Sequence, residues 1–144
     1  MLVPDVNVLL AAFRPGHPHH APALGVLSAA HAGAPGAPVL GLADLALASV
    51  LRLATNPRVF PDPDDPADVL DYLDALLQPP AVLLTGSPGT WCRFASLCRE
   101  QGLRGNAVPD AHLAALALEH RAELVTFDRG FARYPGLRWS VPPG

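Results

Sequence analysis

The stretch Leu2-Val3-Pro4-Asp5-Val6-Asn7-Val8-Leu9-Leu10 decides the fold class, because a short apolar run meets a carboxylate and then a helical pattern. Its first five residues predict a strand, although Pro4 has no N–H for the ladder of a central strand. Asn7 is expected to cap a helix that runs to about Phe13. A strand that leads directly into a helix is typical of α/β proteins, and Asp5 lies at the junction.

The same alternation continues along the chain. Further strands are predicted over 39–41, 81–84, 123–127 and 137–141, the last at a sheet edge. Helices are predicted over 21–32, 42–55, 90–101 and 108–120, and another is expected to begin with Asp65 as N-cap and Pro66 in its first position. Short apolar strands separated by helices predict an α/β fold with a mainly parallel sheet. The inward stripes of the second and third helices are expected to include Leu24, Leu27, Leu45 and Leu53.

Length and composition favour one globular domain spanning residues 1–144, with half of the residues hydrophobic. No run approaches the roughly 20 apolar residues of a membrane helix, and a first strand at Leu2 leaves no room for a targeting segment. We therefore expect a cytoplasmic protein that does not enter the membrane. Cys92 and Cys98 point to different faces of one predicted helix, so a disulfide between them is not expected. Both are expected to be buried, reduced thiols.

The formal charge of −3 is unevenly distributed. Six aspartates lie between Asp62 and Asp74, and the remaining ten arginines and seven acids leave +3 for the rest of the chain. Every basic residue is arginine, the better bidentate phosphate ligand. An all-arginine inventory in a chain rich in Ala and Pro is equally explained by a base-composition bias of the genome.

Three other aspartates fall at the positions where α/β sheets bind ligands, the carboxyl ends of parallel strands. Asp5 ends the first strand, Asp128 follows the strand over 123–127, and Asp110 lies at the start of the helix over 108–120. Asp110 could instead be a first-turn helix acid, and Asp128 an ordinary turn residue. Asp5 is harder to dismiss, because burying an unpartnered carboxylate is costly.

Four stretches together resemble the motifs of PIN-domain nucleases, and in particular of VapC toxins. They are residues 2–13, 52–60 (RLATNPRVF), 105–117 (GNAVPDAHLAALA) and 125–131 (VTFDRGF). In order and spacing the resemblance spans nearly the whole chain. It implies a PIN-type three-layer α/β/α fold with a central sheet of four or five strands, and the activity of a toxin ribonuclease.

The resemblance also implies a metal site. Asp5 and Asp110 match the principal ligands of Mg²⁺ or Mn²⁺, and Asp128 matches a supporting acid that acts directly or through water. Such sites hydrolyse RNA phosphodiester bonds and leave a 5′-phosphate and a 3′-hydroxyl. Asn7 and Asn106 match positions behind the ligands or against the phosphate, although helix capping explains Asn7 equally well.

The chain departs from the family pattern at two places. Ser49 stands where the family usually has a glutamate, and Gly130 where many relatives carry another aspartate. Asp44 is the nearest acid, but five residues correspond to about 500°, so it lies about 140° around the helix from Ser49. Asp44 is either a fourth ligand or a helix-start acid. By the same geometry His112 lies roughly 200° from Asp110 and is expected to face elsewhere.

Two other functions share features of this sequence. Receiver domains also place an aspartate after the first strand, but they need a lysine and the chain has none; related phosphatases need Asp-x-Asp, and the second position here is Asn7. A PIN-like RNA-binding or protein-interaction module with weakened catalysis remains open because of Ser49 and Gly130. As a toxin, the chain would have RNA as substrate, a small antitoxin as partner and a homodimeric state.

Overall fold

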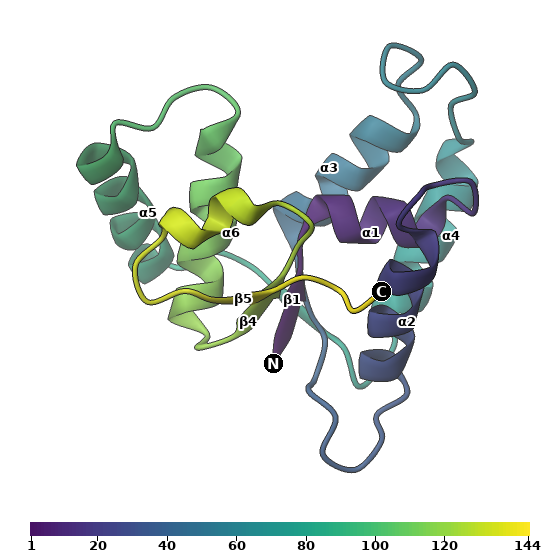
Figure 1. Ribbon diagram of the computed structural model, residues 1–144, viewed down its shortest axis with the longest axis horizontal. Coiled ribbons are helices and arrows are strands. Elements are labelled where there is room, and N and C mark those ends of the chain that lie inside the picture. The colour runs from purple at the N-terminus through teal and green to yellow at the C-terminus, as the bar shows by residue number, and fades with distance from the viewer.

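Five short parallel strands form the centre of the protein, which a computed structural model describes over residues 1–144 (Figure 1). One ladder has the order β1-β4-β5 and a second joins β2 to β3. A parallel bridge between Leu2 and Leu40 connects the two, which gives the overall order β3-β2-β1-β4-β5. The strands are β1 (Leu2–Pro4), β2 (Gly41–Ala43), β3 (Val82–Leu84), β4 (Glu123–Val125) and β5 (Arg138–Ser140).

The proline in β1 explains why the sheet is divided there. Alternate residues of a strand direct their N–H groups to the same neighbour. The Leu2 N–H donates to the Val39 carbonyl on the β2 side (2.8 Å), whereas the Asp5 N–H donates to the Val125 carbonyl on the β4 side (2.9 Å). Pro4 lies in the register of Leu2 and has no N–H to donate toward β2. The β1–β4 ladder is therefore complete, while the β1–β2 side holds a single bridge.

Two groups of helices flank the strands. Figure 1 shows α1, α2, α3 and α4 on one side and α5 and α6 on the other, with the sheet between them. The predicted three-layer α/β/α fold with a mainly parallel sheet of four or five strands is confirmed; the sheet has five strands and its pairings are parallel. The helices are α1 (Val6–Phe13), α2 (His20–His31), α3 (Asp44–Ala54), α4 (Pro66–Leu76), α5 (Pro88–Gln101) and α6 (Ala107–Glu119), followed by the 3-10 helix η1 (Arg129–Arg133).

The second strand begins two residues later than predicted, at Gly41 rather than Val39. A Cβ at Gly41 would lie 2.8 Å from both Leu84 Cδ1 and Met1 Sδ, so a larger residue there would require these two side chains to shift. Gly41 was expected to end a strand. It begins one instead, and α3 starts correspondingly later, at Asp44.

Alanines, rather than the larger leucines, occupy much of the inner faces of α2 and α3. Leu24 is 44% exposed and Leu45 55% exposed, so the prediction that they point inward was wrong; Leu27 is buried as predicted. The inner faces are formed by Ala23, Leu27 and Ala30 in α2 and by Ala46, Leu47, Val50 and Ala54 in α3. Small side chains there let the helices approach closely, and Leu24 and Leu45 stay outside the buried core.

Other local predictions have mixed outcomes. Asp65 caps α4 by accepting a hydrogen bond from the Ala67 N–H (2.8 Å), with Pro66 in the first helical position, as predicted. Both cysteines are free, but Cys92 is exposed rather than buried. No helix combines the length and the apolar character needed to cross a membrane.

Candidate active site

Asp5 occupies the junction between β1 and α1 and is only 6% exposed. Its Oδ1 accepts a hydrogen bond from the Val6 N–H (2.6 Å), so Asp5, not Asn7, is the N-cap of α1. Its Oδ2 accepts a hydrogen bond from the Thr126 hydroxyl (2.7 Å). Both carboxylate oxygens are therefore fixed in direction by groups of the fold.

Thr126 is the centre of this network. It follows β4 directly and is completely buried. Its hydroxyl donates to Asp5 and accepts from the Asp128 N–H (2.9 Å) and from the Asn7 amide nitrogen (3.0 Å). One donor and two acceptor positions are all that a hydroxyl offers. Thr126 thus ties the carboxyl ends of β1 and β4 into one rigid unit.

Asn7 belongs to the same network. Besides its bond to Thr126, its Oδ1 accepts a hydrogen bond from the Phe127 N–H (3.2 Å). The prediction that Asn7 caps α1 was wrong, because Asp5 takes that position. Asn7 lies behind Asp5 and positions the segment that carries Asp128.

Asp110 and Asp128 add negative charge beside Asp5. Asp110 is half-buried on the first turn of α6, and no residue of the protein forms a hydrogen bond or ion pair with its carboxylate. Asp128 is exposed and accepts a hydrogen bond from the Gly130 N–H (2.7 Å) as it begins η1. Burial raises the pKa of Asp110, the neighbouring Asp128 raises it further, and Arg133 opposes the change.

The same effects act more strongly on Asp5. Burial raises the pKa of Asp5 to about 6, its hydrogen bonds to Thr126 and Val6 act in the opposite direction, and Asp110 and Asp128 raise it further. The ionised form of Asp5 is therefore disfavoured in the folded protein, and a bound cation would remove this electrostatic penalty. This electrostatic situation is typical of functional sites.

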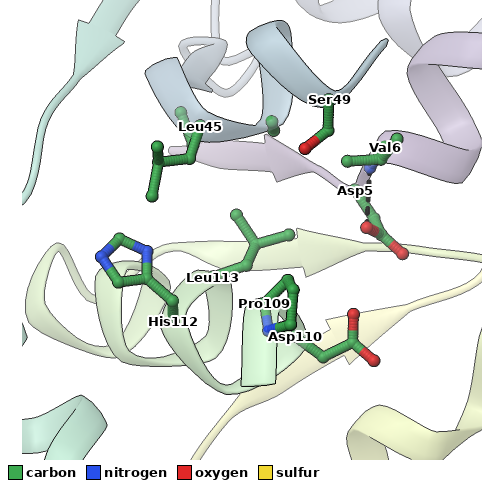
Figure 2. Close-up of a pocket in the computed structure, with 10 residues that line it drawn as sticks. Asp5, Val6, Leu45, Ser49, Pro109, Asp110, His112 and Leu113 are labelled. Carbon is green, nitrogen blue, oxygen red and sulfur yellow. Dashed lines mark hydrogen bonds between the residues drawn. The ribbon is translucent and has the colours of Figure 1, made fainter. Parts of the chain in front are cut away.

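Asp5 and Asp110 face one narrow cavity of about 70 Å³ between α3 and α6 (Figure 2). Ser49 lines the cavity from α3, at the position where a glutamate was expected. These donors are all oxygens, which suit a hard divalent cation that keeps several waters and uses one or two carboxylates. No three His, Cys, Asp or Glu side chains gather tightly enough to enclose an ion, so the pair Asp5 and Asp110 is the direct candidate. Asp128 does not line the cavity, although its charge acts on both carboxylates.

Two other predicted site residues lie apart from this cavity. Asp44 begins α3, where its carboxylate accepts a hydrogen bond from the Leu45 N–H (2.7 Å), and it does not line the cavity. The helix turns about 140° between Asp44 and Ser49, so only Ser49 is presented inward. Asn106 is exposed before α6 and makes no side-chain hydrogen bond.

Sequence reasoning missed two residues of the site. Thr126 was part of a recognised motif without a role, although a polar residue at the end of a buried strand was a usable signal. His112 was expected to face elsewhere, but it lines the same cavity as Asp110. The predicted angle between Asp110 and His112 around the helix was right. The cavity is wide enough to contact both side chains and the face of α6 between them.

Comparison with known proteins identifies the family of this chain. The PIN domain family model matches residues 2–137. The chain is 43% identical to ribonuclease VapC43 of Mycobacterium tuberculosis, with 99% of this chain and 95% of the relative covered. The chain belongs to the VapC family of PIN-domain ribonucleases. Ribonuclease VapC37 of the same organism is 40% identical, with 99% of this chain and 98% of the relative covered.

Solved structures of VapC proteins share the fold. VapC20 of M. tuberculosis, described as a sarcin-ricin loop cleaving toxin, superposes with a TM-score of 0.69 at 16% identity and covers 96% of this chain and 99% of its own. The VapBC2 complex of Rickettsia felis, bound to a DNA fragment of its promoter, gives a TM-score of 0.69 at 17% identity, with 97% of each chain covered. The PIN architecture of this VapC protein is therefore that of its solved relatives.

Proposed function

We propose that residues 1–144 form one PIN domain that acts as a toxin endoribonuclease and hydrolyses RNA phosphodiester bonds with a divalent cation, Mg²⁺ or Mn²⁺. The observation that carries the proposal is the buried carboxylate of Asp5, which faces Asp110 across one cavity at the carboxyl edge of a parallel sheet. Ligand sites of α/β sheets lie at this edge. Membership of a ribonuclease family supports the same reaction.

Each group has a defined task in this proposal. Asp5 and Asp110 would hold the cation, and Asp128 would support it through water. When bound, the cation supplies positive charge that lowers the pKa of water and stabilises the charge developing on the phosphate. Thr126 and Asn7 keep Asp5 in place, and Arg133, whose charge acts on Asp110, offers a guanidinium to the RNA backbone.

The partners follow from the same proposal. Structural relatives include toxin–antitoxin complexes, such as one from Klebsiella pneumoniae with a TM-score of 0.65. We expect a small antitoxin to bind this chain and block the cavity of Asp5 and Asp110, and we expect the toxin to form a homodimer.

A cleavage assay with purified protein tests the proposal. A structured RNA should be cut in Mg²⁺, and EDTA should abolish cutting. Asp5→Asn should lower the rate at least about 10³-fold, because the loss of cation binding removes several kcal/mol of transition-state stabilisation. Asp71→Asn, on the exposed side of α4, is the matched control and should cut like the wild type.

The competing function is a PIN-like binding module with weakened catalysis, suggested by Ser49 and Gly130. RNA that is bound tightly but left intact in Mg²⁺ and in Mn²⁺ would favour this module and contradict the proposed ribonuclease.

A further inference from the structure

The cavity that contains Asp5 and Asp110 has a second end, marked by His112 (Figure 2). Along α6, Pro109 and Leu113 share one face, with Asp110 about 100° to one side of Pro109 and His112 about 60° to the other. All four side chains line the cavity. It is therefore a slot between α3 and α6 that runs from two carboxylates to one imidazole.

The walls between these ends are apolar. Ala46 and Leu45 face the slot from α3, and Leu113 faces it from α6. Figure 2 shows Ser49 on the side of Asp5, so the polar groups of the lining gather at the acidic end and His112 stands apart from them. Binding sites for small organic groups are mostly apolar, and a few polar groups fix the orientation of what they bind.

His112 is held in place but has unused hydrogen-bonding capacity. Its ring meets the Phe94 ring edge to face, with centroids 5.4 Å apart. The side chain is half-buried, and its ring nitrogens take part in none of the hydrogen bonds of the protein. A neutral imidazole has one donor and one acceptor nitrogen. Nε2 lies toward Gly86, which does not line the cavity, so Nδ1 is the nitrogen that faces the slot and is open to a ligand there (Figure 2).

We propose that the slot binds the nucleobase next to the cleaved phosphodiester and that His112 reads the edge of that base. The inference rests on the proposed ribonuclease function, which places the phosphate at the carboxylates. Phosphate and base are joined through a single sugar, so a base carried into the slot approaches His112 when the phosphate is at Asp5 and Asp110. Proteins recognise RNA sequence mainly on unstacked bases, through contact with the flat faces and hydrogen bonds to the edges.

The test measures base preference rather than activity alone. A pool of RNAs with random sequence is cut by the wild type in Mg²⁺, and the product ends are sequenced. The wild type should show a preferred base at one position beside the cut. His112→Ala should reduce that preference about tenfold, the worth of one or two neutral hydrogen bonds. His112→Gln, which presents a donor and an acceptor in a different geometry, should change which base is preferred, and an unchanged preference in this variant would contradict the role of His112.

His120→Ala is the matched control, since His120 is an exposed histidine at the end of the same helix. It should leave the distribution of product ends unchanged. Melting temperatures of all variants establish that they are folded, and the Gln variant carries the test if the Ala variant is not.

Three results would overturn the inference while the ribonuclease function stands: cutting without any base preference, a preference that survives His112→Ala, or a change in His112→Ala confined to antitoxin binding. The last would mean that the slot takes a protein side chain. Absence of cutting by the wild type in Mg²⁺ and Mn²⁺ would overturn the proposed function and the inference together.

Discussion

The protein has two acidic regions, and they behave in opposite ways. The segment from Asp62 to Asp74 holds six aspartates within thirteen residues, yet its carboxylates only form surface ion pairs, cap a helix or face solvent. Asp62 and Asp64 pair with Arg14, Asp65 caps α4, and the others face solvent. The second region assembles Asp5, Asp110 and Asp128 from three distant parts of the chain, and there the pKa of Asp5 is raised to about 6.

The difference shows that the density of charge along the sequence does not make a site. An exposed aspartate keeps its hydration and gains little from a cation. A carboxylate held under the surface beside other carboxylates has lost hydration and gains much from one. Burial at the sheet edge, not the number of acids, therefore separates a candidate metal site from a solvated helix face.

The largest expected contrast is in cleavage. Asp110→Asn should lower the rate of RNA hydrolysis at least about 10³-fold, because it removes one of two carboxylates facing the cation. Asp71→Asn removes the same charge from the acidic segment and should change the rate less than about twofold. Single-turnover rates at saturating RNA measure both. Equal losses in the two variants would mean that the two acidic regions do not differ in function.

The second contrast is in stability as a function of pH, without metal. The folded protein keeps the Asp5 proton up to about pH 6, whereas the unfolded chain loses it near 3.8. Because the folded state binds this proton more tightly, Asp5 contributes fully to stability below pH 3.8. The contribution is lost as the pH rises through 6, which lowers the free energy of unfolding by about 3 kcal/mol in total.

Thermal melts between pH 4 and 8 measure this effect. Asp5→Asn should flatten the wild-type decline, Asp71→Asn should not, and Mg²⁺ should restore stability to the wild type above pH 6 because a cation offsets the buried charge. If Asp5→Asn has the same dependence of stability on pH as the wild type, then the raised pKa of Asp5 is not the cause of the decline.

The smallest effect concerns the network that fixes Asp5. Thr126→Val keeps the shape of a buried side chain and removes its three hydrogen bonds to Asp5, Asn7 and Asp128. We expect a loss of roughly 1–3 kcal/mol in unfolding free energy and about tenfold in cleavage rate, since Asp5 is no longer held in one direction.

Thr55→Val is the control for that experiment, because the Thr55 hydroxyl bonds to the Leu51 carbonyl at the end of α3 (2.7 Å), away from the carboxylates. It should affect stability without affecting cleavage. Chemical denaturation and cleavage rates together distinguish the two variants, and a Thr126→Val protein that cuts at the wild-type rate would show that the network serves the fold alone.

Local sequence signals determined much of this protein. The strand-then-helix opening, the alternation that follows it and four spaced motifs predicted the PIN architecture, the parallel sheet and the family, because these features depend on residues close together in the chain. The positions of Asp5, Asp110 and Asp128 at strand ends and a helix start followed from the same signals.

Tertiary packing decided the rest. It placed Asp5 rather than Asn7 at the cap of α1, buried alanines rather than Leu24 and Leu45 in the core, and brought His112 to the cavity while leaving Asp44 outside it. Spacing along a helix fixes the angle between two side chains, but a neighbouring helix determines which arc of angles faces the cavity. That neighbour is distant in sequence, so its effect is visible only once the chain is folded.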